Sequence, residues 1–122
     1  MAVRRMPLIA GNWKLNKGTA REATDLVNEI KALLGDSAGV EVVVCPPYTA
    51  LHAAKQAIGD DTIQLGAQNV YWKESGAYTG QVSAAMLRDA GVTHVIIGHS
   101  EARGRFGVPE PDFSPDVLKH FG

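Results

Sequence analysis

Residues 40–47 read Val-Glu-Val-Val-Val-Cys-Pro-Pro, a run of β-branched residues that carries one charge and ends in two prolines. This run predicts a short strand, because β-branched residues favour strands and proline cannot continue the hydrogen-bond ladder. Three other short apolar segments, at 8–10, 63–67 and 94–97, are followed by glycine or polar residues. Strands that are apolar along their whole length are typical of parallel sheets that are buried on both faces.

Helices separate these strands. The clearest one begins after Thr19, because Thr19 and Glu22 have the spacing of a capping box. Its apolar residues then recur every three or four positions until Gly35, which predicts one buried face. Residues 49–58 and 83–90 predict two shorter helices. Four strands alternating with helices indicate an α/β fold with parallel strands and right-handed crossovers.

Length and composition set limits on the function. The chain has 122 residues and a net charge of -1, which fits a single domain over residues 1–122 and argues against a nucleic-acid or membrane-surface partner. A single cysteine, Cys45, excludes an internal disulfide and a cysteine-rich zinc site. The apolar start after Arg4-Arg5 imitates a signal peptide but ends too early at Asn12. We therefore expect a cytoplasmic protein with no membrane segment.

Polar side chains follow three of the predicted strands. In parallel α/β folds, binding and catalysis collect at the carboxyl ends of the strands. An amide, an ammonium and an imidazole at one edge would suit an anionic ligand that carries a carbonyl. Each residue alone is more often a turn residue, a solvated charge or a helix-start residue. The candidates are Asn12, Lys14, Gln68, Asn69, His99, Ser100 and Glu101.

Three motifs point to one family. Residues 11–16, Gly-Asn-Trp-Lys-Leu-Asn, resemble the first-strand signature of triosephosphate isomerase. Residues 76–80, Gly-Ala-Tyr-Thr-Gly, resemble that family's interface loop, and residues 95–101, Val-Ile-Ile-Gly-His-Ser-Glu, resemble its fourth strand and electrophile motif. The motifs occur in family order, and the resemblance extends from about Pro7 to about Gly107.

The resemblance implies an isomerase that interconverts dihydroxyacetone phosphate and glyceraldehyde 3-phosphate in glycolysis and gluconeogenesis, without a metal or organic cofactor. It implies that Asn12 and Lys14 bind this phosphorylated triose and that His99 is the neutral electrophile that polarises the carbonyl. Ser100 and Glu101 would support the site, Glu101 by holding Lys14 in place. The resemblance also implies a homodimer in which Thr79, beside Tyr78, reaches the rim of the neighbour's active site.

The chain departs from the family pattern in length. A barrel of this kind needs eight βα units and about 250 residues, whereas four strands are found here. The general-base glutamate, its lid and the phosphate loops belong to the second half, so we expect this chain alone to be inactive. Gln81 and Ala102 replace a usual Glu–Arg pair. Residues 102–122 are expected to form an extension of the fourth loop with a short helix, and residues 107–120 are expected to be an insertion.

Half a barrel leaves two sheet edges and an apolar face uncovered. We favour a four-stranded parallel (β/α)4 half-barrel that associates through these edges with a second copy, most simply with two-fold symmetry. The alternative is a reordered, doubly wound sheet like that of Rossmann folds. The function likewise has two interpretations: an isomerase portion, or a short natural relative that acts as a binding or assembly module without catalysis. A reading frame that continues past Gly122 with a fifth strand would favour the first.

Overall fold

The computed structural model describes residues 4–36 and 39–103, in which strands and helices alternate along the chain. The strands are β1 (Leu8–Asn12), β2 (Glu41–Cys45), β3 (Gln64–Ala67) and β4 (His94–Val95). The helices are α1 (Ala20–Leu34), α2 (Leu51–Ile58) and α3 (Ala84–Asp89), and one 3-10 turn, η1 (Tyr48–Ala50), leads into α2.

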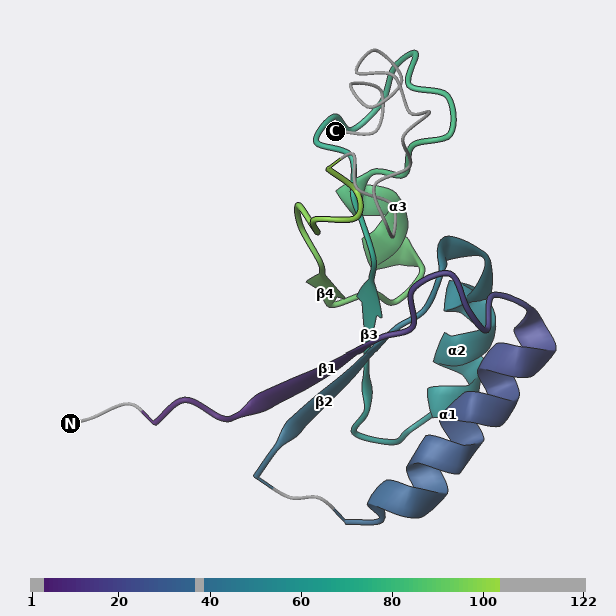
Figure 1. Cartoon of the computed structure of the whole chain (residues 1–122), viewed down its shortest axis with the longest axis vertical. Coiled ribbons are helices and arrows are strands. Elements are labelled where there is room, and N and C mark those ends of the chain that lie inside the picture. The colour runs from purple at the N-terminus through teal and green to yellow at the C-terminus, as the bar shows by residue number, and fades with distance from the viewer. Residues whose placement is uncertain (1–3, 37–38, 104–122) are drawn as a thin grey trace, which may run out of the picture.

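The strands form one parallel sheet in the order β1-β2-β3-β4. Each strand therefore pairs with its neighbour in sequence, and Figure 1 shows α1 and α2 side by side on the same side of β1 and β2. Right-handed crossovers between adjacent strands place successive helices on one side of a sheet. The predicted (β/α)4 half-barrel is confirmed. The alternative doubly wound sheet is wrong, because it requires a point at which the strand order reverses.

Helix α1 begins and ends where the sequence predicts. The Thr19 hydroxyl accepts a hydrogen bond from the Glu22 amide at 3.2 Å and donates to the Glu22 carboxylate at 2.8 Å. This differs slightly from the usual capping box, in which the Glu carboxylate accepts a hydrogen bond from the backbone amide of the N-cap residue, here Thr19. The helix ends at Gly35, whose φ of 53° is in the left-handed region and whose amide donates to the carbonyl of Lys31.

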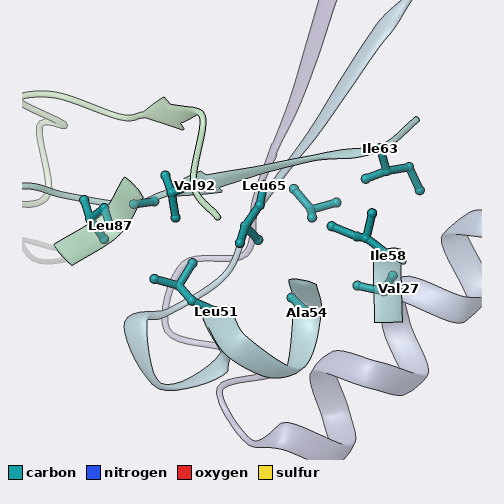
Figure 2. Packing of buried hydrophobic residues seen from close by; sticks show 10 residues of the cluster. Val27, Leu51, Ala54, Ile58, Ile63, Leu65, Leu87 and Val92 are labelled. Atoms are coloured by element: carbon teal, nitrogen blue, oxygen red, sulfur yellow. The ribbon is translucent and has the colours of Figure 1, made fainter. Parts of the chain in front are cut away.

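A hydrophobic core fills the space between the helices and the sheet. Figure 2 shows side chains of α1, α2 and β3 pointing toward one another, with Leu65 near the centre of the cluster. Burial of this kind is the main stabilising contribution in a domain of this size. The buried members of the cluster are Val27, Val44, Leu51, Ala54, Ile58, Ile63, Leu65, Ala67, Leu87 and Val92.

Strand β1 is exposed, which agrees with the uncovered sheet edge expected of a half-barrel but not with the burial on both faces that its apolar sequence alone indicates. Leu8 is 47% exposed and Ile9 is 61% exposed. Within the described residues β1 pairs with β2 alone, so its other edge has no strand beside it. These side chains would be buried only if other segments lay beside and over β1. The sequence pattern shows which residue types the strand contains, but it does not show which segments lie next to it.

Polar side chains link three strands at their amino ends. Gln64, at the start of β3, donates to the Glu41 carboxylate of β2 at 2.8 Å. His94, at the start of β4, has its Nε2 atom 3.3 Å from the same carboxylate. These contacts link β2, β3 and β4 at the end of the sheet opposite to the predicted site.

Several boundaries differ from the sequence prediction. Strand β4 ends at Val95 and not at residue 97, although the Ile96 amide still donates to the Ala67 carbonyl at 2.9 Å. The helix predicted from residue 49 begins as the 3-10 turn η1. In the described part of the chain, every helix is too short or too polar to cross a bilayer. The predicted extension at 102–122, with its insertion at 107–120 and short helix, lies outside the described residues from position 104 onward.

Candidate active site

The polar residues predicted at the carboxyl ends of the strands meet at one edge of the sheet. Asn12 is the last residue of β1, and Lys14 follows two positions later. His99 and Glu101 lie in the turn after β4. The ammonium of Lys14 donates to Oε1 of Glu101 at 2.8 Å, although the two residues are 87 positions apart in the chain. The fold thus brings together the first and last motifs of the resemblance, and the predicted contact between Lys14 and Glu101 is present.

The backbone at Lys14 is unusual. Its φ of 57° is in the left-handed region, which costs a residue with a side chain roughly 1–2 kcal/mol. The Asn12 side-chain carbonyl offsets part of this cost by accepting the Lys14 amide hydrogen at 2.9 Å. Strained residues of this kind concentrate at functional sites, where the surrounding structure holds them. No local sequence pattern indicates this conformation at Lys14.

His99 is oriented by the turn that follows it. The Glu101 amide donates to Nδ1 of His99 at 3.1 Å, so Nδ1 acts as an acceptor and carries no proton. The same Nδ1 lies 3.5 Å from Oε2 of Glu101, which would be an ion pair only with a protonated ring. The shorter amide hydrogen bond occupies that lone pair, so we assign a neutral imidazole with its proton on Nε2. Such a ring can donate one hydrogen bond to a ligand.

The turn itself is held by its own backbone. The amides of Ala102 and Arg103 donate to the His99 carbonyl at 2.9 and 3.2 Å, and the Arg103 amide also lies 3.2 Å from the Ser100 carbonyl. This arrangement fixes the chain direction at His99. Ser100 is exposed, and its predicted supporting role remains a prediction.

Electrostatics favour an ionised carboxylate at Glu101. The hydrogen bond from the Lys14 ammonium is the main cause that lowers the pKa of Glu101 below its ordinary value, and partial desolvation opposes it. The Lys14 side chain is 54% exposed and the Glu101 side chain 31% exposed. The pair is therefore open to solvent on one side, where an anionic ligand could approach the ammonium.

The loop at 68–80 carries the other predicted residues. The Tyr78 ring packs on the Tyr71 ring with 4.6 Å between their centroids, and it lies over Gly76, where a Cβ would come within 2.7 Å of the ring. Thr79 is exposed in this loop. Within the described residues, the hydrogen bonds of the site do not include Thr79, so its predicted role at an interface remains a prediction.

Sequence reasoning missed the contribution of Gln68. It identified this residue as polar and close to the end of a strand, but it gave the side chain no role. In the structure the Gln68 amide group donates to the carbonyl of Lys14 at 2.8 Å and to the carbonyl of Cys45 at 2.9 Å. No local pattern signals a contact of this kind, because its partners lie in two other segments of the chain. Asn69, the other polar residue after β3, is half-buried.

Comparison with known proteins gives the family. The family model described as "Triosephosphate isomerase" matches residues 7–117. The chain belongs to the triosephosphate isomerase family. It is 55% identical to the triosephosphate isomerase of Pelobacter propionicus over 103 residues, which cover 84% of this chain and 41% of that protein. It is 53% identical to the triosephosphate isomerase of Moorella thermoacetica over 114 residues, which cover 93% of this chain and 45% of that protein.

A solved triosephosphate isomerase supports the half-barrel. The crystal structure of the Bartonella henselae protein matches with a TM-score of 0.74 and 41% sequence identity, over 84% of this chain and 41% of that one. The chain therefore spans less than half the length of the triosephosphate isomerases it matches, and it corresponds to their amino-terminal portion. The four parallel strands described above are the matching half of a TIM barrel.

Proposed function

We propose that this chain supplies the carbonyl-polarising half of a triosephosphate isomerase site, which interconverts dihydroxyacetone phosphate and glyceraldehyde 3-phosphate. The observation that supports it best is the cluster of Lys14, Glu101 and a neutral His99 at the carboxyl ends of the strands. The Nε2–H of His99 would donate to the substrate carbonyl, and the Lys14 ammonium would offset the charge of the phosphate and of the enediolate. The Asn12 amide would add a further donor.

We further propose that the polypeptide of residues 1–122 does not catalyse this reaction by itself. The isomerisation requires a base that removes a proton next to the carbonyl, and a positioned base contributes roughly 10²–10⁴-fold to the rate. Among the described residues, the carboxylate that contacts the site is Glu101. Its hydrogen bond to Lys14 lowers its pKa and occupies one of its oxygens, so it is a weak and obstructed base.

A direct assay tests both proposals. The purified polypeptide is incubated with dihydroxyacetone phosphate, and conversion is followed by proton NMR. We expect no conversion above the buffer rate but measurable binding of the substrate, which weakens in Lys14→Met and His99→Ala. The exposed His52 on α2 offers a matched control, and His52→Ala should bind like the parent. Turnover that disappears in His99→Ala but survives in His52→Ala would refute the proposed inactivity.

The same assay separates the second candidate, a binding or assembly module without catalysis. The open ammonium of Lys14, 54% exposed beside an oriented His99, favours it, because these groups can bind an anion without a base. If the polypeptide binds the triose phosphate and a version extended by a triosephosphate isomerase carboxyl-terminal half remains inactive, the module is the better description. Restored turnover in the extended version supports the isomerase.

We also propose that two copies of the 1–122 polypeptide associate through the exposed edge of β1. Met6, Leu8 and Ile9 are 59%, 47% and 61% exposed, and an apolar strand with an open edge favours pairing with another chain. Ile9→Lys should weaken the association in sedimentation analysis, whereas Leu33→Lys, at an 87% exposed position on α1, should not. A parent that sediments as a monomer at high concentration would refute this proposal.

The role of Thr79 and Tyr78 at a subunit interface is a further part of the proposal. The exposed loop that carries them supports it, and Thr79→Ala in an extended, active protein would test it. The cytoplasmic location expected from the sequence stays a prediction.

A further inference from the structure

Three polar groups of Lys14 each have a partner from a different part of the chain. Its amide donates to the side chain of Asn12 in β1, and its ammonium donates to Glu101 after β4. Its carbonyl accepts a hydrogen bond from the side chain of Gln68, which follows β3. The first two residues were expected at the site from the resemblance, whereas Gln68 had no assigned role.

The geometry of Gln68 makes it a bridge between strands. Its side-chain nitrogen donates to the Lys14 carbonyl at 2.8 Å and to the Cys45 carbonyl, at the end of β2, at 2.9 Å. An amide nitrogen has two hydrogens, so both bonds can form at once. The Cys45 carbonyl also accepts the Trp13 amide at 3.1 Å. Gln68 therefore joins the ends of β2 and β3 to the segment that leaves β1.

That segment needs an external restraint. Lys14 has a left-handed backbone with φ of 57°, and Lys17 has a φ of 56°, which residues with side chains rarely adopt. Such conformations persist when surrounding contacts over-determine them. The Lys14 side chain is more than half exposed, so packing does not hold it. Hydrogen bonds to its backbone, together with the contact of the ammonium with Glu101, therefore fix the direction in which the ammonium points.

We propose that Gln68 is a positioning residue that holds the strained backbone of Lys14, and thereby keeps the Lys14 ammonium directed at Glu101 and at the ligand. This inference rests on the proposed function for its catalytic meaning. Gln68 acts through Lys14 and does not itself touch the reacting atoms. Substitution of Gln68 leaves the Lys14 side chain present but mobile. The contact between Lys14 and Glu101 is then populated for a smaller fraction of the time.

The titration of Glu101 reports this contact without any substrate. The Lys14 hydrogen bond lowers the pKa of Glu101, and the carboxyl carbon of this residue can be followed by ¹³C NMR as the pH is changed. Lys14→Met removes the ammonium altogether, so it should give the largest rise in the pKa of Glu101 and serves as the upper limit for the other variants. We expect Gln68→Met, which keeps the length of the side chain and removes its donors, to produce most of this rise. The matched control is Gln56→Met, at an exposed position on α2, and it should leave the pKa of Glu101 unchanged.

The double variant Lys14→Met/Gln68→Met separates positioning from a general structural effect. If Gln68 acts through Lys14, the second substitution adds nothing to the first. The proposal would be overturned if Gln68→Met raised the pKa of Glu101 in the Lys14→Met background by as much as it does in the parent. It would also be overturned if a folded Gln68→Met variant left the pKa of Glu101 unchanged. Gln68→Asn serves as a second variant, because its shorter side chain cannot span both carbonyls. Unfolding of both Gln68 variants would also overturn a positioning role, since the residue would then be required for the fold itself.

The outcome is independent of the isomerase assignment. A chain that binds no triose phosphate but shows the expected Glu101 titrations contradicts the proposed function and leaves Gln68 in its positioning role. If the parent chain binds dihydroxyacetone phosphate but Gln68→Met leaves the titration of Glu101 unchanged, only the role of Gln68 is contradicted. If the proposed function and the positioning role of Gln68 are both correct, Gln68→Met should also weaken the binding of dihydroxyacetone phosphate, but by less than Lys14→Met does.

Discussion

Gly66, in the middle of β3, is the position at which the smallest side-chain change should have the largest effect. A Cβ built there would lie 2.6 Å from Sγ of Cys45 and 2.9 Å from Cγ1 of Val43, both on the neighbouring strand β2. Cys45 and Val43 are 2% and 1% exposed, so neither side chain can move toward solvent. Gly66→Ala must therefore displace packed atoms.

The size of the effect follows from two opposing contributions. Overpacking a core by one carbon costs typically about 1–3 kcal/mol, whereas Gly→Ala at an unstrained position stabilises by roughly 0.4–1 kcal/mol through the unfolded state. The expected net loss for Gly66→Ala is about 1–2 kcal/mol. In urea unfolding followed by circular dichroism, this corresponds to a midpoint about 0.5–1 M lower at the usual slopes.

Gly11 on β1 provides the control. A Cβ there would meet its nearest atoms at 3.9 and 4.0 Å, which is ordinary contact, so Gly11→Ala should be neutral or slightly stabilising. Adding Cys45→Ala to Gly66→Ala removes the closest clashing atom, and the two substitutions should couple favourably by about 1 kcal/mol. If Gly66→Ala proves as stable as Gly11→Ala, the close packing of β2 against β3 is not as described.

Three other substitutions test separate features. Thr19→Ala removes the cap of α1 and should cost about 1 kcal/mol in the same urea assay; Thr24→Ala, within the helix, should cost less. Leu65→Ala removes a side chain that is 1% exposed at the centre of the core, and it should cost about 2–5 kcal/mol. Lys14→Met should change how stability depends on acidity. Because the pKa of Glu101 is lowered in the folded chain, its charged form stabilises the fold above its ordinary pKa of 4.5 in the unfolded chain, and this stabilisation is lost as the pH falls through the lowered value. The parent should therefore lose stability between these two pH values, and Lys14→Met should show a smaller loss in urea midpoints measured across that range.

The sequence predicted those parts of the fold that depend on local chemistry. Thr19 and Gly35 marked the ends of α1 because capping uses residues three or four positions apart, and such contacts are visible in the sequence. The alternation of apolar runs with helices predicted parallel strands but left two strand orders open, and the order β1-β2-β3-β4 in the structure decides between them. The exposure of Ile9 was not predicted from the strand pattern, since burial depends on which segments lie beside a strand.

The candidate site was predictable in its members but not in its geometry. The motif resemblance placed Asn12, Lys14, His99 and Glu101 at one edge, and the 2.8 Å contact between Lys14 and Glu101 agrees with it. The left-handed backbone of Lys14 and the bridge made by Gln68 depend on contacts between three strand ends. A single sequence carries no local signature of such contacts.

The distance along the chain between Lys14 and Glu101 has a consequence for synthesis and degradation. Since their contact spans 87 positions, the part of the site that holds both side chains cannot form until the ribosome has released the segment beyond the fourth strand. A protease cut in the exposed stretch 72–80 would leave the two halves of the edge on separate pieces. Retention of a negatively charged ligand after limited proteolysis would thus reveal whether the sheet alone keeps the severed pieces associated.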